Sequence, residues 1–195
     1  MRRFRFAFLA VPLILVMGIG PVSADTTGGG PGTSFSSFSE SCSTKGPVTT
    51  CTDTNLFAFA DASGSIVCLD IFRFAQDSRG HFIFRSDKSG CTSGATFTVG
   101  AGNAVTVAPT TVVLAKCGRQ RCVHPTSYTV SASDSRSGPT TTTTTVSTST
   151  NGTCTTITTT VDVFTPLSGT MTVNGKSMSE DGGLDVSTQD SSSTC

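Results

Sequence analysis

Large apolar side chains concentrate in residues 55–86, where they form three short runs separated by polar segments. The runs are Leu56–Ala60, Ile66–Phe74 and Phe82–Phe84. The polar segments between them are rich in Gly, Asp and Ser, which favour tight turns. This pattern predicts an antiparallel meander of three strands.

The middle run, Ile66–Phe74, is apolar at both alternating sets of positions. Successive side chains of a strand point to opposite faces, so we expect this run to be a central strand that is covered on both faces. Asp70 and Arg73 are its only charged residues. We expect them to mark the place where the strand reaches solvent.

Later segments alternate apolar with hydroxyl side chains, which is typical of half-buried strands. These segments are Ala95–Val99, Val105–Val107 and Tyr128–Ala132, and the apolar run Val112–Leu114 resumes the second strand after Pro109.

The threonine-rich segment 140–162 has two interpretations. β-Branched residues favour extended backbone, and Asn151–Gly152 is a strong turn sequence, so the segment fits a hairpin. A Ser/Thr-rich stretch can also be a disordered stalk with O-linked sugars. The apolar row of Val146, Ile157 and Val161 favours the hairpin.

The strand pattern, with no helical periodicity beyond the N-terminal segment, predicts an all-β fold. We expect an antiparallel β-sandwich or barrel-like domain of about eight to ten strands, stapled by disulfides. The expected organisation is a signal peptide (1–24), a flexible Gly/Thr/Pro leader (25–34), a β-domain (35–175) and a polar C-terminal tail (176–195) tethered by Cys195.

The N-terminal segment has the pattern of a secretory signal peptide. Basic residues at its beginning are followed by the apolar run 6–19 and by small residues ending at Ala24. We expect cleavage near Ala24 and a secreted, extracellular protein, or one in the periplasm or cell envelope. The apolar run is short for a bilayer, and no later run is longer, so no membrane span is expected in the mature form.

The chain contains eight cysteines, an even number that predicts four disulfides in an oxidising compartment. They are Cys42, Cys51, Cys68, Cys91, Cys117, Cys122, Cys154 and Cys195. Spacing alone leaves about 105 pairings open. If neighbours along the chain pair, Cys42 bonds to Cys51, Cys68 to Cys91, Cys117 to Cys122, and Cys154 to Cys195.

Composition argues against several function classes. Removal of the signal peptide leaves ten basic and thirteen acidic residues, a net charge of −3, whereas nucleic-acid binding normally needs a basic excess. The sequence has no hydrolase motif, and we expect neither a cofactor nor a metal. Cys117, Cys122 and His124 lack the paired spacing of a zinc site. An enzyme of unrecognised type would have to use Asp70, His81 or His124.

The segment between Cys117 and Cys122 is the most distinctive candidate binding loop. A bridge between these cysteines would hold Arg119 and Arg121, with Lys116 beside them, in a small preordered loop. Preordered arginines are suited to binding carboxylates of a protein partner.

The leading hypothesis is therefore a secreted, non-enzymatic β-domain with an extracellular or cell-envelope role in interaction or structure, whose partner is an extracellular protein. One alternative is an extracellular protease inhibitor, or another protein-binding module, acting through the Cys117–Cys122 arginine loop. A further alternative is the unrecognised enzyme.

Overall fold

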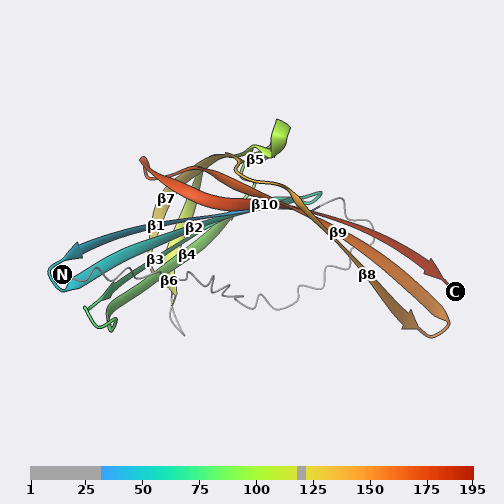
Figure 1. Ribbon diagram of the computed structural model, residues 1–195, viewed down its shortest axis with the longest axis horizontal. Helices are drawn as coiled ribbons and strands as arrows, with labels where there is room; N and C mark the ends of the chain where they lie inside the picture. Colours follow the sequence, from blue (N-terminus) through green and yellow to red (C-terminus); the bar gives the residue numbers. More distant parts are fainter. Residues whose placement is uncertain (1–31, 118–121) are drawn as a thin grey trace, which may run out of the picture.

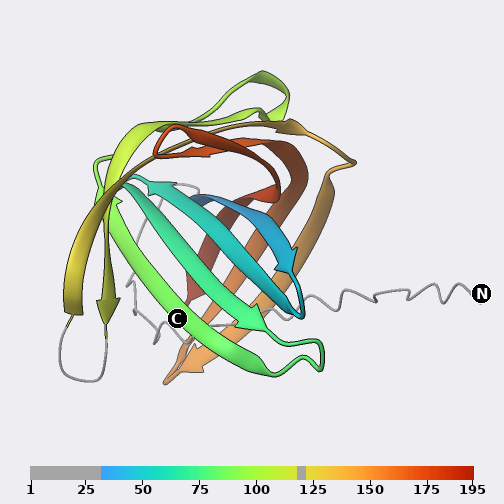
Figure 2. The ribbon, with the colours of Figure 1, turned by 90° about the vertical axis from the view of Figure 1, so that its left-hand side faces the viewer.

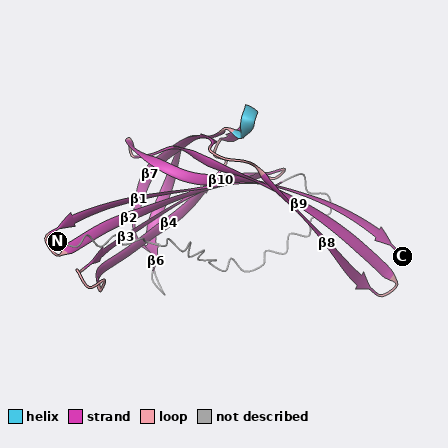
Figure 3. Cartoon of the chain, in the orientation of Figure 1, coloured by secondary structure: helices cyan, strands magenta, loops and turns pink. Residues whose placement is uncertain are grey.

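The computed structural model describes residues 32–117 and 122–195 of the chain. Strands dominate these ranges, and the only helix among them is one short turn (Figure 3). The elements are β1 (Gly32–Lys45), β2 (Val48–Asp61), β3 (Gly64–Gln76), β4 (Phe82–Ser93), β5 (Phe97–Val99), η1 (Ala101–Asn103), β6 (Val105–Cys117), β7 (Cys122–Arg136), β8 (Thr141–Asn151), β9 (Cys154–Val173) and β10 (Lys176–Thr194). The predicted all-β, antiparallel fold is confirmed.

Residues with positive φ form the turns of the two hairpins that include β9. Asn174 and Gly175, with φ of +49° and +77°, connect β9 to β10. A two-residue turn with both φ values positive matches the right-handed twist of the flanking strands. Gly152, with φ of +63°, opens the turn between β8 and β9. The threonine-rich segment therefore forms the predicted hairpin rather than a stalk.

The strands form one sheet in the order β10-β1-β2-β3-β4-β6-β7-β9-β8, with β5 paired to β6. β10 also pairs with β9, so the two sides of the sheet meet and the sheet curves into a partial ring (Figures 1 and 2). The pairing of β10 with β1 covers Asp181–Ser187. The pairing with β9 covers all of Lys176–Thr194.

The seam between β4 and β6 is narrow and depends on a glycine. Only one register pair, Ser89 with Ala115, joins the two strands. A Cβ atom at Gly90 would collide with the backbone carbonyl of Val113 and crowd the side chain of Leu114. Gly90 therefore allows the backbone of β6 to approach β4 closely.

The interior of the ring is packed by side chains from the inner faces of the strands, in a single hydrophobic cluster. Its buried members are Phe35, Leu56, Ala58, Val67, Leu69, Val105, Val107, Val112, Leu114, Val130, Ala132, Leu167, Met171, Val173 and Leu184. Most are aliphatic. Phe35 is the one phenylalanine among the described residues that is fully buried, and its ring stacks on that of Phe97 at 6.3 Å.

The expectation that Ile66–Phe74 is covered on both faces is wrong. In β3, Val67 and Leu69 are buried in the interior, whereas Ile66 is 42% exposed and Phe72 and Phe74 are only partly buried. The described strands form a single curved layer, so none of them covers the outer face of β3. Two apolar faces therefore do not establish a two-sided core here.

Residues 176–195, predicted as a polar tail, instead supply β10. The inward positions of this strand include Met178, Glu180 and Leu184, and Leu184 is buried in the core. Polar side chains occupy the alternate, outward positions, which made the segment resemble a tail. The predicted leader also ends earlier than expected, because residues 32–34 belong to β1.

Three strands form an arm, which we define as residues 141–151, 154–164 and 185–194 (Figure 1). Its first three residues on β10, Asp185–Ser187, still pair with β1, and the rest of the arm extends beyond the ring. β8 pairs with β9, and β9 pairs with β10, along this arm. The disulfide Cys154–Cys195 joins two of the strands near its end.

The described residues contain three disulfides, Cys42–Cys51, Cys68–Cys91 and Cys154–Cys195. Each links antiparallel neighbours, as the neighbour pairing predicts. Cys117 and Cys122 are register partners across β6 and β7. The predicted bridge between their side chains lies outside the described residues.

We expect Gly90→Ala to lower the free energy of unfolding by about 1–3 kcal/mol, because the added methyl group would push β6 away from β4. Urea denaturation followed by circular dichroism measures this change. Ser93→Ala, an exposed position on the same strand, is the matched control and should change the free energy by less than about 0.5 kcal/mol. Equal effects of the two substitutions would contradict a tight seam.

Candidate functional site

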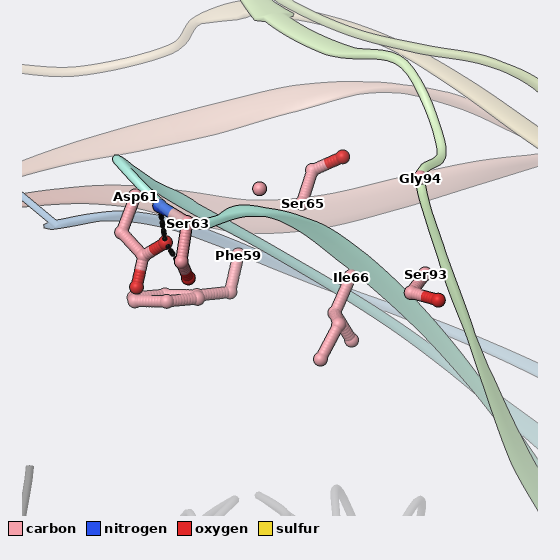
Figure 4. A pocket seen from close by; sticks show the side chains of 8 residues that line it. Phe59, Asp61, Ser63, Ser65, Ile66, Ser93 and Gly94 are labelled. Atoms are coloured by element: carbon pink, nitrogen blue, oxygen red, sulfur yellow. Dashed lines mark hydrogen bonds between the residues drawn. The ribbon is translucent and has the colours of Figure 1, made fainter.

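The two largest hollows described among residues 32–117 and 122–195 are lined mainly by turn residues and by Ser and Thr side chains. One hollow of about 340 Å³ lies at the turn between β2 and β3 (Figure 4). Its carboxylate, Asp61, accepts hydrogen bonds from the backbone N–H and the hydroxyl of Ser63 at 2.7 and 2.5 Å, which lower the pKa of Asp61. The hydroxyl of Ser65 donates to the carbonyl of Ala95. These polar groups hold the turn together.

A second hollow, of about 370 Å³, lies where β1 and β10 separate beyond their paired segment. Its lining consists mostly of Ser and Thr side chains, with Glu40 and Lys176 at its margin. The Ser39 hydroxyl donates to the Ser179 carbonyl at 2.8 Å and connects the two strands where they diverge. Neither a histidine nor a cysteine lines this hollow.

Two carboxyl groups are buried inside the ring, at Asp134 on β7 and Glu180 on β10. Both residues are register partners of Gly169 on β9, so they flank it on the same face of the sheet. A Cβ atom at Gly169 would collide with Asp134 Oδ1. The missing side chain of Gly169 therefore leaves the space in which the two carboxyls approach each other.

Burial changes the proton affinity of this pair. It raises the pKa of Glu180 to about 8; the nearby Asp134 adds to the rise, and the Ser37 hydroxyl acts in the opposite direction. Burial also raises the pKa of Asp134, which the interaction with Glu180 partly offsets. At neutral pH Glu180 therefore holds a proton beside Asp134.

Such a pair could in principle transfer protons to a substrate. However, Asp134 and Glu180 are each only 4% exposed, and neither lines the hollows at the β2–β3 turn or between β1 and β10. A substrate would have to displace the packed core to reach them. The geometry is that of a structural carboxyl pair.

The sequence analysis did not identify this pair, although both residues occupy inward positions in the alternating patterns of β7 and β10. Asp134 continues the inward series of Val130 and Ala132. Glu180 lies two residues after Met178 and four before Leu184, on the same face of β10. A carboxyl at an inward position of an otherwise apolar series indicates a buried ionisable group.

A second group of carboxyls lies on the outer face, where Asp53, Asp70 and Asp87 come from three neighbouring strands. Burial raises the pKa of Asp70 to about 6, and Asp87 and Asp53 add to the rise. Asp70 was expected where the strand reaches solvent. Instead it is partly buried and lies among other carboxyls.

Glu40, beside these carboxyls, also lies close to the sulfurs of Cys42 and Cys51, and its Oε1 is 3.0 Å from Cys42 Sγ. The two sulfurs are joined in a disulfide. Because thiolates are the form of cysteine that binds metals, these sulfurs do not complete a metal site.

Two of the candidate enzyme residues, Asp70 and His81, are not brought together. Asp70 lies in the middle of β3, whereas His81 lies in the turn after Gln76, roughly 20 Å further along the strand. His81 Nδ1 is 3.2 Å from Asp77 Oδ2, and its backbone N–H donates to Asp77 Oδ1 at 2.9 Å. His81 therefore belongs to the structure of the turn. The side chain of His124 lies outside the described residues.

The loop residues Arg119 and Arg121 lie outside the described residues, as does the side chain of Lys116. Their predicted role in binding stays a prediction.

An exposed apolar group lies on β3 and β4 near their connecting turn, and we call it the aromatic surface. Its members are Phe72, Phe74 and Phe82, whose rings are in contact, and Phe82 is 61% exposed. Phe84, although 50% exposed, is the register partner of the buried Ala75 and lies on the other face of the sheet. The sequence predicted a strand here but not its exposure, because alternation does not say which face is covered.

Rings of the aromatic surface contact one another in a row. The centroids of Phe72 and Phe74 are 5.4 Å apart, and those of Phe74 and Phe82 are 5.7 Å apart in an edge-to-face arrangement. The guanidinium carbon of Arg85 lies 5.6 Å from the centroid of Phe72. These are the separations of favourable aromatic and cation–π pairs, so the exposed rings hold each other in defined positions.

No protein-family model, curated protein or solved structure matches this chain. The described residues include no helix long and apolar enough to cross a membrane. The geometry of the chain itself is therefore the basis for a functional proposal.

The buried carboxyl pair predicts that stability falls as pH rises. A raised folded-state pKa means that the folded protein binds more protons than the unfolded chain between about pH 4.5 and 8. The free energy of unfolding should therefore decrease over this range, by about 1–3 kcal/mol. We expect Glu180→Gln to flatten the decrease between pH 6 and 8 in urea denaturation.

Asp181→Asn is the matched control, because its exposed side chain is adjacent on β10. It should keep the wild-type slope between pH 6 and 8. Asp70→Asn should affect the slope mainly below pH 7, since burial raises the pKa of Asp70 only to about 6. A wild-type protein that becomes more stable from pH 6 to 8 would contradict a protonated Glu180.

Proposed function

We propose that this protein is an exported, non-enzymatic binding domain that contacts an extracellular protein partner through the aromatic surface. The observation that carries the proposal is the row of contacting rings of Phe72, Phe74 and Phe82, in which Phe82 is 61% exposed and Arg85 packs over Phe72. Contiguous apolar surface of this kind is typical of interaction sites. Aromatic residues and arginine are enriched in the energetic centres of protein interfaces.

The position of the aromatic surface favours binding with little loss of conformational freedom. Its side chains project from two paired strands rather than from a long loop. The disulfide Cys68–Cys91 joins the same two strands. A surface whose backbone is already ordered loses less entropy on association, so more of the contact energy contributes to affinity.

Export is the second part of the proposal. It rests on the predicted signal peptide, residues 1–24, and on the apolar run and small residues within it. Three disulfides among the described residues are consistent with an oxidising compartment outside the cytoplasm. The mature protein would then meet its partner in the extracellular space or the cell envelope.

A protease inhibitor acting through Lys116, Arg119 and Arg121 is the second candidate. One observation favours it: Cys117 and Cys122 face each other in register across β6 and β7, which is the arrangement that a bridged loop requires.

The proposal predicts that a photo-crosslinking phenylalanine at position 82 labels a defined partner in the extracellular and envelope fractions of the producing cells. Excess unlabelled wild-type protein should compete with this labelling. Phe74→Ser combined with Phe82→Ser should compete at least about tenfold less well, because loss of two anchoring rings costs 1.4 kcal/mol or more.

The matched control is the same crosslinker at Ile157, which is 46% exposed on the arm. Labelling of the same product from both positions, or equal competition by the double variant, would rule out the aromatic surface as the contact. Circular dichroism and a disulfide map establish that each variant is folded.

A further inference from the structure

β8 is the outermost strand of the sheet and is exposed along its whole length. All of its residues, Thr141–Asn151, are exposed on both faces of the arm. Within the described part of the chain it pairs with β9 alone, so its second edge presents unpaired backbone N–H and C=O groups. The edge is eleven residues long.

Natural edge strands are normally protected against pairing with other chains by charged side chains, prolines, bulges or short length. β8 has none of these features. Its sequence, TTTTTVSTSTN, contains no charge and no proline, and its register with β9 is continuous. Threonine and valine also favour extended backbone.

Other edges of the same sheet show the contrast. Residues 39–45 of β1 lie beyond its pairing with β10, and this edge carries Glu40 and Lys45. Residues 82–88 of β4 lie beyond its single register pair with β6, and this edge carries Arg85, Asp87 and Lys88. Charges thus protect two incompletely paired edges, while the longer edge at β8 is unprotected.

We propose that β8 is a dimerisation edge, which pairs with β8 of a second copy of this chain in an antiparallel arrangement centred on Val146. Val146 is the midpoint of the strand and is 62% exposed. A two-fold axis at this residue brings the two Val146 side chains together. It joins the two arms into one continuous sheet of six strands.

This register is self-complementary. It places Thr145 opposite Ser147, Thr144 opposite Thr148, and Thr143 opposite Ser149 of the partner copy. Hydroxyl side chains face hydroxyl side chains, which can hydrogen-bond across the strands, and the valines form an apolar pair at the centre. No like charges oppose each other, because β8 has none. Both hydrogen-bonded and non-hydrogen-bonded residue pairs can lie on such an axis.

A cysteine substitution tests the register directly. Paired residues on the axis have Cα atoms about 4.5–5.5 Å apart, within the range that a disulfide spans. Val146→Cys should therefore form an intermolecular disulfide in dilute oxidised protein. Thr142→Cys is the matched control on the same strand and face; its Cα would lie roughly 27 Å from its own copy, so it should crosslink at least about tenfold less.

Analytical ultracentrifugation of the secreted, disulfide-intact protein provides the second measurement. Wild-type protein should show a concentration-dependent dimer. Val146→Lys should raise the dimer dissociation constant at least about tenfold, because two ammonium groups would face each other. Ile157→Lys changes an exposed apolar position on the neighbouring strand of the arm. It should leave the dimer dissociation constant within about twofold of the wild-type value.

Several results would overturn the proposal. These are a monomeric wild-type protein, equal crosslinking of the two cysteine variants, or a dimer that persists unchanged in Val146→Lys. A further such result could come from mass spectrometry of protein from the producing cells. If most hydroxyls of β8 carry O-linked sugars and the protein is a monomer, sugars cover this edge instead of a second copy. Peptide mapping of the native disulfides establishes that each variant is correctly folded.

Discussion

β10 is paired on both sides along Asp181–Ser187, with β1 on one side and β9 on the other. If the β1 pairing were lost, the sheet would be an open ribbon whose apolar inner face had no opposing surface. When β10 pairs with β1, side chains from strands far apart in the sequence face each other across the ring. Phe35 and Leu184, for example, are register partners although they come from opposite ends of the chain. The hydrophobic core therefore depends on this long-range pairing.

Closure also limits what the interior can hold. Eight strands contribute to the ring, and a closed sheet of that size has an interior that side chains alone can fill. Aliphatic side chains of moderate size occupy it, while most of the phenylalanines that the structure describes lie on the outer face. The carboxyls of Asp134 and Glu180 share the interior, and Glu180 avoids the cost of a buried charge by keeping its proton at neutral pH.

Local features of the structure could be predicted from the sequence. The turn at Asn151–Gly152 and the threonine hairpin join segments adjacent in the chain and follow from turn chemistry and alternation. The three disulfides match the pairing of neighbouring cysteines, which is one of the many pairings that spacing leaves open. Which face of β3 is covered could not be predicted, because Val67 and Phe72 are equally apolar and the covering element lies elsewhere in the sequence.

Long-range pairing limited prediction in two other places. β10 resembled a tail because its outward positions are polar, and only its pairing partners reveal its inward series. The Glu180 site was missed for the same reason, since Asp134 and Glu180 meet only when β7, β9 and β10 lie side by side.

The molecule has two kinds of surface that could bind, and they lie at opposite ends of its longest axis (Figure 1). The end with the β3–β4 turn presents large apolar side chains on paired strands, a surface suited to side-chain recognition. The arm at the other end has few apolar side chains and presents an unpaired backbone edge, suited to strand pairing. Because they lie at opposite ends of the molecule, a partner at one surface would leave the other surface accessible. A dimer joined through the arms would carry two aromatic surfaces at its outer ends, and a partner displayed in many copies would then be bound with a higher effective concentration than by a single chain.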